Sequence, residues 1–290
     1  DSPGYHMAGI LLDHGQEPGS VDLVARKSAD SGIQRMIING ICIRQPQLAK
    51  KYKNISVTDK NTAFGKSFAE KNNCTFVEKN VDVIKDSKYI FIAVKPQFLD
   101  EVFSEISSSI TENQVVISMA AGVKIEKLNN FAPKARFIRI MPNVCASIQE
   151  SMISVCCNSN IKAEELNQAK ELLSECGIVE EVPEKLMDCV TAVSGSGPAF
   201  VFMFIEAIAD AAVRCGMPRQ QAYTYAAQTV KGSAELVLQT KKHPAELKDM
   251  VCSPAGTTIE GVSVLEENGF RNAVIKAICA ANQKSIDLGK

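Results

Sequence analysis

Residues 192–216 read AVSGSGPAFVFMFIEAIADAAVRCG, and the rest of the chain is interpreted around them. Small residues fill positions 195–197, Pro198 stands where a helix would begin, and Gly216 fits a left-handed helix cap. The residues between are apolar apart from two acids and one arginine, and a helix this apolar is buried on most sides. It is too short and too interrupted by acids for a membrane span. The stretch therefore predicts the central helix of a helical domain, with a helix N-terminus after a glycine turn that can face a ligand.

On the N-terminal side of this stretch, short apolar strands alternate with helices, whereas only helices follow on its C-terminal side. The expected strands span residues 55–58, 74–77, 89–94, 115–118, 137–141, 152–155 and 178–182. Apolar strands separated by helices are typical of parallel βαβ units with right-handed crossovers. The chain therefore predicts an α/β fold: a doubly wound parallel sheet followed by an all-helical domain.

The last expected strand ends at Val182, and we place the domain boundary there. The sheet domain then spans residues 36–182 and the helical domain residues 183–290. Residues 1–35 show no sustained period, and GSVD at 19–22 and GIQ at 32–34 resemble translated restriction sites. We therefore expect residues 1–35 to be a non-native leader or a divergent N-terminus.

The composition excludes several classes of partner. The 290 residues carry a formal net charge of −1, with 46% hydrophobic and 22% charged residues, so we expect neither nucleic-acid nor membrane binding. The ten cysteines show no C-x-x-C spacing and the three histidines form no cluster. This predicts buried free thiols in a reducing cytoplasm and no metal site. The apolar helix after Pro198 predicts a homo-oligomer, because a two-layer monomer would leave it exposed.

Ligands of doubly wound sheets bind where the parallel strands end. In this chain those positions hold Asp59-Lys60, Lys95-Pro96, Ala120-Ala121-Gly122 and Pro142-Asn143. Lys95 either contacts a ligand there or simply ends its strand. A second glycine turn, SPAGTT at 253–258, precedes a helix whose free amides can hold a small carboxylate. Thr257 or Thr258 can cap that helix, and an ordinary capped helix is the alternative interpretation.

Several motifs together resemble the Δ1-pyrroline-5-carboxylate reductase family. They are AVSGSGPAF at 192–200, GMP at 216–218, LKDMVCSPAGTTIE at 247–260, LEENGFR at 265–271, AVKP at 93–96 and RIMPN at 139–143. The match runs in order from about Met36 onward. The resemblance implies a Rossmann-type cofactor domain, a helical dimerisation domain and a cytoplasmic oxidoreductase. The implied reaction is the reduction of 1-pyrroline-5-carboxylate to L-proline by hydride transfer from NAD(P)H, the last step of proline biosynthesis.

The resemblance also implies a set of site residues. Thr258 is the implied catalytic residue: its hydroxyl orients the imine nitrogen of the substrate while the proton comes from solvent. The implied substrate-binding residues, which hold a cyclic imine carboxylate, are Ser196, Gly197, Gly256, Thr257 and Thr258. The implied cofactor-binding residues are Asp59, Asn61, Ala93, Val94, Lys95, Pro96, Ala120, Ala121, Gly122 and Asn143.

The cofactor turn departs from the family pattern. A glycine fingerprint of the G-x-G-x-x-G type should precede residues 37–41, but only Gly32 is a glycine there, and it is out of register. This predicts weak NAD(P)H binding and loss of activity. The resemblance also places a first strand before this turn, and the leader interpretation predicts that the sheet lacks that strand. Asp59 favours the free ribose hydroxyl of NAD, whereas Lys60 and Asn61 can accept the 2′-phosphate of NADP. The resemblance favours NADP.

Two alternative functions stay open. One is a non-catalytic family member with a broken cofactor turn. The other is a two-domain hydroxyacid-type dehydrogenase, which would place a catalytic lysine on the central helix, whereas residues 194–215 contain none. Glu206 and Asp210 share a helix face and form either a catalytic pair or, in the favoured interpretation, structural groups at a subunit interface.

Overall fold

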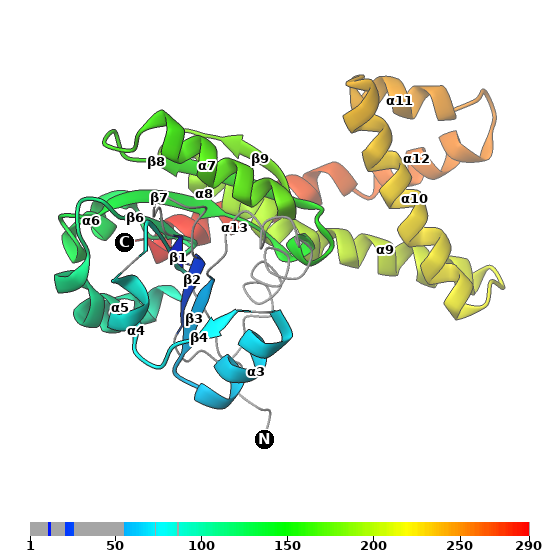
Figure 1. The fold of residues 1–290 in the computed structure, drawn as a ribbon. Helices are drawn as coiled ribbons and strands as arrows, with labels where there is room; N and C mark the ends of the chain where they lie inside the picture. Colours follow the sequence, from blue (N-terminus) through cyan, green and yellow to red (C-terminus); the bar gives the residue numbers. More distant parts are fainter. Residues whose placement is uncertain (1–10, 13–20, 26–54, 73, 86, 290) are drawn as a thin grey trace. The chain divides into compact units, whose positions relative to one another are not determined.

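The computed structural model describes residues 11–12, 21–25, 55–72, 74–85 and 87–289, and the chain divides into two units (Figure 1). The sheet unit comprises residues 1–195 and 281–290, and the helical unit comprises residues 196–280. The sheet ends at Glu181, and the domain boundary near Val182 stays a prediction.

The strands of the described residues form one sheet in the order β4-β3-β2-β1-β5-β6-β7-β8-β9. They are β1 (Leu11–Leu12), β2 (Val21–Ala25), β3 (Ser56–Asp59), β4 (Thr75–Phe76), β5 (Tyr89–Ile92), β6 (Val115–Ser118), β7 (Arg136–Met141), β8 (Ser151–Cys157) and β9 (Gly177–Glu181). The short β1 pairs antiparallel with β2 and β5, and β7 pairs antiparallel with β8, whereas the other pairings are parallel. The parallel run from β4 through β2 and β5 to β7 has the Rossmann strand order, as predicted.

Strand β2 lies in the middle of this parallel run. Leu23 is in parallel register with Val57 of β3 and with Phe91 of β5. The prediction that the sheet lacks its first strand is therefore wrong. Residues 21–25 read VDLVA, and valine favours extended backbone where neighbouring strands offer hydrogen bonds. The position expected for the glycine fingerprint lies outside the described residues, and the leader interpretation of residues 1–35 stays a prediction.

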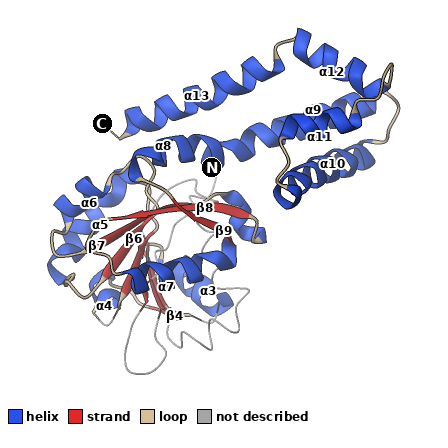
Figure 2. Cartoon of the chain, turned by 90° about the horizontal axis from the view of Figure 1, so that it is seen from above, coloured by secondary structure: helices blue, strands red, loops and turns tan. Residues whose placement is uncertain are grey.

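Helices cover both faces of the sheet (Figure 2). Those of the sheet unit are α3 (Thr62–Asn72), α4 (Asn80–Ile84), α5 (Leu99–Ile106), α6 (Ile125–Phe131), α7 (Ala163–Leu173) and α8 (Met187–Val190). Within β5, Tyr89 and Phe91 belong to the core shared with α3 and α7, whereas Ile90 and Ile92 belong to the core shared with α4, α5 and α6. None of these four side chains is more than 2% exposed, which confirms a strand buried on both faces.

The helical unit is built from helices that cover one another poorly. They are α9 (Gly197–Arg214), α10 (Arg219–Thr240), α11 (Pro244–Val251), α12 (Thr257–Glu267) and α13 (Phe270–Leu288), the last of which ends in the sheet unit. Ala209 of α9 packs against Ala222 and Ala226 of α10. Phe202 and Met203 are 56% and 68% exposed. The prediction that this helix is buried on most sides is therefore wrong for the single chain.

The apolar helix also begins earlier than predicted. A continuous helix over Glu184–Arg214 includes α8, a π-helical segment at Thr191–Ser196 and α9. With 31 residues and a mean hydropathy of 1.5 in its apolar window, it is long and apolar enough to cross a membrane by length and composition. The prediction that this helix is too short for a membrane span is therefore wrong, because the helix begins before Pro198 and is longer than the sequence pattern indicated. The wide π-helical turns before Pro198 accommodate its missing N–H.

Candidate functional site

The carboxyl ends of β5, β6 and β7 are aligned at one edge of the sheet. Ile92 is in register with Ser118, and Ser118 is in register with Arg139. The structure thereby brings together the loops that contain most of the predicted cofactor residues. Ala93 and Val94 are fully buried, whereas Lys95 and Pro96 are half-buried where a 3₁₀ turn leads into α5.

The loop after β6 is a tight turn of small residues. The Val123 N–H donates to the Ala120 carbonyl across 3.4 Å, and Gly122 has a φ of 75°. A left-handed third residue is what a type II turn requires, and glycine adopts it without strain. Ala121 is half-buried beside the fully buried Ala120. With no large side chain in the turn, a ligand can approach the backbone here.

Asn143 closes β7 and supports the loop that follows. Its N–H donates to Ser151 Oγ (3.0 Å), and its Oδ1 accepts from the Cys145 N–H (2.9 Å). The side chain therefore caps the 3₁₀ turn Val144–Ile148. Burial and then the charge of Glu150 raise the pKa of the Cys145 thiol, so this thiol stays protonated near neutral pH and is a poor nucleophile.

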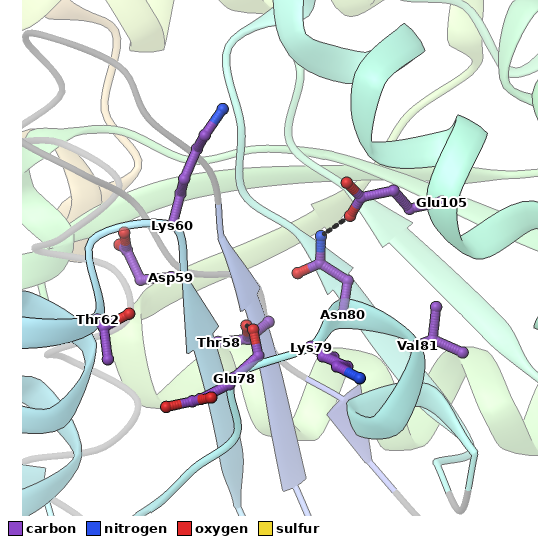
Figure 3. Close-up of a pocket in the computed structure, with 9 residues that line it drawn as sticks. All are labelled: Thr58, Asp59, Lys60, Thr62, Glu78, Lys79, Asn80, Val81 and Glu105. Carbon is purple, nitrogen blue, oxygen red and sulfur yellow. Dashed lines mark hydrogen bonds between the residues drawn. The ribbon is translucent and has the colours of Figure 1, made fainter.

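A pocket of about 460 Å³ opens at the ends of β3 and β4 (Figure 3). Its lining residues are Thr58, Asp59, Lys60, Thr62, Glu78, Lys79, Asn80, Val81 and Glu105. Asp59 belongs to the predicted cofactor set, whereas Glu78, Lys79, Asn80 and Glu105 were not predicted. Residues 78–80 follow β4, the neighbour of β3, closely. That position is the signal that identifies them, because parallel neighbours end at the same edge.

Polar contacts hold the lining of this pocket in place. Asp59 Oδ1 accepts from the Asn61 N–H (2.7 Å), and Asn61 Oδ1 accepts from the Phe64 N–H (3.0 Å), so both side chains shape the turn that begins α3. Lys60 Nζ donates to Glu101 Oε1 on α5 across 3.2 Å. On the opposite wall, the Asn80 amide donates to a carboxylate oxygen of Glu105 at 2.7 Å. Carboxylates can bind hydroxyl groups here, and lysines can bind phosphate.

The predicted carboxylate site lies at the start of α12 in the helical unit. Gly256 is the N-cap of that helix and has no side-chain capping hydrogen bond. The prediction that Thr257 or Thr258 caps it is wrong, because both lie inside the helix. A Cβ on Gly256 would lie 2.2 Å from Ser253 Oγ, so a larger residue does not fit without displacing that side chain. The amides of the first turn of α12 are thus left without a side-chain cap.

The turn before Gly256 holds an unusual backbone conformation. Ala255 has a φ of 54°, and the Gly256 N–H donates to the Ser253 carbonyl across 3.0 Å. A left-handed alanine costs about 1 kcal/mol or more. Such strain is found most often where function requires a particular backbone geometry.

Ser196 and Gly197 lie where the π-helical segment meets α9, so the predicted free helix N-terminus at residues 195–197 is wrong. Upstream of them, the Thr191 hydroxyl donates to the Met187 carbonyl (2.8 Å) and the Ser194 hydroxyl to the Val190 carbonyl (2.9 Å). Within the described part of the helical unit, no hydrogen bond joins residues 196–197 to residues 256–258. Gly197 faces open space: a Cβ there would meet no atom within 4 Å.

Two further predictions concern charged and thiol side chains. Asp210 forms an ion pair with Arg219 of α10, which favours the structural interpretation of the acids on α9.

The described cysteines are all free. Burial raises the pKa of Cys176 to about 12, whereas others such as Cys279 are exposed in the single chain. Among the residues that the structure describes, no three His, Cys, Asp or Glu side chains gather as a metal site.

Comparison with protein-family models matches both parts of the chain. Residues 184–288 match the family described as pyrroline-5-carboxylate reductase dimerisation. Residues 36–122 match the family described as NADP oxidoreductase, coenzyme F420-dependent. The dimerisation match includes α9, in which Phe202 and Met203 are exposed in the single chain.

Curated relatives share this similarity over most of their length. A pyrroline-5-carboxylate reductase from Methanosarcina acetivorans is 44% identical over 238 residues, which cover 82% of this chain and 88% of the relative. The Escherichia coli protein of the same name is 48% identical over 214 residues, covering 73% of this chain and 80% of the relative.

Solved structures show the same relationship. The pyrroline carboxylate reductase of Plasmodium falciparum, solved with NADP bound, aligns with a TM-score of 0.77 and 29% identity over 89% of this chain and 94% of that one. A pyrroline-5-carboxylate reductase from Coxiella burnetii aligns with a TM-score of 0.79 and 29% identity over 88% of this chain and 94% of that one.

Proposed function

The chain belongs to the pyrroline-5-carboxylate reductase family, and we propose that it reduces 1-pyrroline-5-carboxylate to L-proline with NAD(P)H, the last step of proline biosynthesis. One observation in the structure supports binding of this substrate most directly. The helix N-terminus at Gly256 is uncapped by any side chain, which leaves its first-turn amides able to bind a small carboxylate.

The start of α12 is proposed to hold the substrate. The amides after Gly256 and the positive end of the helix dipole bind the carboxylate, with Thr257 contributing through its backbone. The half-buried Thr258 places its hydroxyl in the first helical turn, where it hydrogen-bonds and orients the imine nitrogen. A hydroxyl is too weak an acid to supply the proton, which therefore comes from solvent. Ser196 and Gly197 are proposed as further substrate contacts.

The strand-end loops of the sheet unit are proposed to hold the cofactor, which supplies the hydride when bound. The residues present fit such a group, because the turn at Ala120–Gly122 lets a ligand approach its backbone and the pocket at β3 offers charged and polar side chains. The proposed contacts are Asp59, Asn61, Ala93, Val94, Lys95, Pro96, Ala120, Ala121, Gly122 and Asn143. Asn143 acts in part by holding its own loop in place.

NADP is the proposed cofactor in preference to NAD. Lys60 and Lys79 both line the pocket at the end of β3, where they can neutralise a 2′-phosphate. The Lys60 side chain is 49% exposed, so it can turn from Glu101 toward a ligand. Asp59 would favour NAD, and its Oδ1 accepts a hydrogen bond from the Asn61 N–H, so the two lysines are the feature that favours NADP.

Turnover of the purified chain tests the proposed reaction. We expect NADPH oxidation that depends on 1-pyrroline-5-carboxylate, and NADP⁺ reduction that depends on proline at high pH. Folded protein without either reaction would contradict the enzyme and support the non-catalytic alternative. Turnover with a 2-hydroxy acid but not with proline would support the hydroxyacid-type dehydrogenase.

The non-catalytic alternative has one observation in its favour. Residues 26–36 lack the glycine fingerprint that should follow β2, and this predicts weak cofactor binding. Titration with NADPH, followed by its fluorescence, measures the affinity directly. A dissociation constant in the micromolar range would contradict the weak-binding prediction.

The active species is proposed to be a cytoplasmic homodimer or a larger homo-oligomer. The match to the dimerisation family covers residues 184–288, the part in which Phe202 and Met203 are exposed. A second chain that covers these side chains would remove them from water, which favours association. In such an oligomer, the second chain and not a membrane covers the exposed apolar side chains of the helix of residues 184–214.

A further inference from the structure

The end of α13 contacts the turn after β6, although more than 150 residues separate the two in sequence. We propose that residues 281–289, which we call the α13 end segment, position the turn Ala120–Gly122 for the cofactor. This inference rests on the proposed role of that turn in binding NAD(P)H. The segment acts through the turn, so its members are positioning residues and not catalytic ones.

The contact between the segment and the turn is one of backbone on backbone. A Cβ on Gly289 would lie 2.6 Å from the carbonyl oxygen of Gly122. A Cβ on Gly122 would lie 3.3 Å from the nitrogen of Gly289 and 3.4 Å from the carbonyl carbon of Leu288. No side chain fits at Gly289 unless the segment or the turn moves. The position of one backbone therefore limits the position of the other.

A buried hydrogen bond anchors the segment beside this contact. Ser285 Oγ donates to Asp188 Oδ1 of α8 across 2.7 Å, and Ser285 is only 4% exposed. Met187, the neighbour of Asp188, is fully buried in the core of the sheet unit. Ser285 thus links α13 to α8 beside a side chain that is packed in the core of the sheet unit.

The turn itself has little internal support. Within it, the Val123 N–H reaches the Ala120 carbonyl only at 3.4 Å, a long and weak hydrogen bond. The apolar burial of the α13 end segment is limited, since Leu288 is 64% exposed and Ile286 is only half-buried. Loss of the contact should therefore alter the position of the turn more than the stability of the fold.

Two variants remove the contact in different ways. Ser285→Ala deletes the anchoring hydrogen bond, and Gly289→Val introduces a side chain where the Gly122 carbonyl lies. We expect Ser285→Ala to raise the KM for NADPH about fivefold, the effect of one hydrogen bond. Gly289→Val should raise it at least as much, because the turn must move to admit the side chain. We expect little change in kcat, in the KM for 1-pyrroline-5-carboxylate or in the melting temperature. Asp188→Asn retains an oxygen that accepts from Ser285 and should behave as the wild type, whereas Asp188→Ala should resemble Ser285→Ala.

Matched controls are Ser263→Ala and Gly232→Val. Ser263 bonds only within its own helix, to the Ile259 carbonyl, and a Cβ on Gly232 would meet no atom within 4 Å. Hydrogen exchange of the peptide over residues 119–124 gives a readout independent of activity: it should speed up in Ser285→Ala and Gly289→Val but not in the controls. Unchanged exchange in both variants would overturn the inference. An inactive wild type with faster exchange in these variants would instead count against the proposed function alone.

Discussion

Thr258 is the residue on which the proposed chemistry depends most directly. It is half-buried in the first turn of α12, next to the uncapped amides after Gly256. We expect Thr258→Ala to lower kcat about tenfold to a hundredfold, because the imine loses the group that orients it. Thr258→Ser retains the hydroxyl and should recover most of the rate in a steady-state assay.

A matched control for this variant is Thr229→Ala, because the Thr229 hydroxyl bonds only the Tyr225 carbonyl of its own helix. Equal rates for Thr258→Ala and wild type would contradict the role of the hydroxyl. A rise in the KM for the substrate at unchanged kcat would assign Thr258 to binding alone.

Glu165 makes the stability of the sheet unit depend on pH. Burial raises the pKa of its carboxyl, but hydrogen bonds from Arg136 and the Lys162 N–H, together with nearby positive charges, lower it more, to a net value below the ordinary 4.5. The Arg136 Nη1 to Glu165 Oε2 distance is 2.5 Å. A lowered pKa in the folded state adds stability above pH 4.5, and this stability is lost as the pH falls through the folded pKa.

We therefore expect the urea midpoint of the wild type to fall between pH 5 and pH 3 more steeply than that of Glu165→Gln. The variant should be less stable at pH 7, because Arg136 loses its charged partner. Glu164→Gln, on the same first turn of α7 but exposed, should follow the wild type. Parallel pH profiles for wild type and Glu165→Gln would contradict the assignment.

At the scale of elements, the turn between β3 and α3 is proposed to set the preference for NADPH over NADH. Lys60 is the cation of this turn, and its partner Glu101 is itself 46% exposed, so the pair is weak. We expect Lys60→Ala to raise the KM for NADPH about tenfold while the KM for NADH changes little, because only NADPH carries the 2′-phosphate.

The measurement is the ratio of kcat/KM for the two cofactors. Lys127→Ala removes an exposed lysine from α6, away from this pocket, and should leave the ratio unchanged. An unchanged ratio of kcat/KM in Lys60→Ala would contradict the proposed role of Lys60 in cofactor preference.

At the scale of the whole molecule, the exposed apolar side chains of the single chain indicate that it associates with a second copy. Met203 is 68% exposed within the part that matches the dimerisation family. We expect Met203→Glu to weaken the oligomer, because the interface would bury a charge without a partner. Sedimentation velocity measures the change as a shift toward the monomer. Ile178→Glu, at a 53% exposed position of β9 outside that part, should sediment like the wild type.

Part of the fold and of the site was predictable from local patterns. The apolar run at residues 89–94 predicted β5, because a strand covered on both faces needs apolar residues at every position. Asp59, Lys95, Gly122 and Asn143 were predictable as neighbours of strand ends. The start of the long helix was not predictable in this way, because Pro198 is typical of a first helical turn yet lies inside the helix. The residue preferences of positions 191–196 do not predict the π-helical turns that precede Pro198.

The sequence by itself determined the α/β class, the order of strands before helices, the family and the positions of the strand-end loops, because each depends on residue types at short spacing. Only the tertiary structure showed β2 between β3 and β5, the pocket walls at Glu78 and Glu105, and the α13 end segment against Gly122. These features join residues that are far apart in the chain, and hydrogen-bond register and backbone contact decide them. Such long-range contacts leave no periodic signal in the segments that make them.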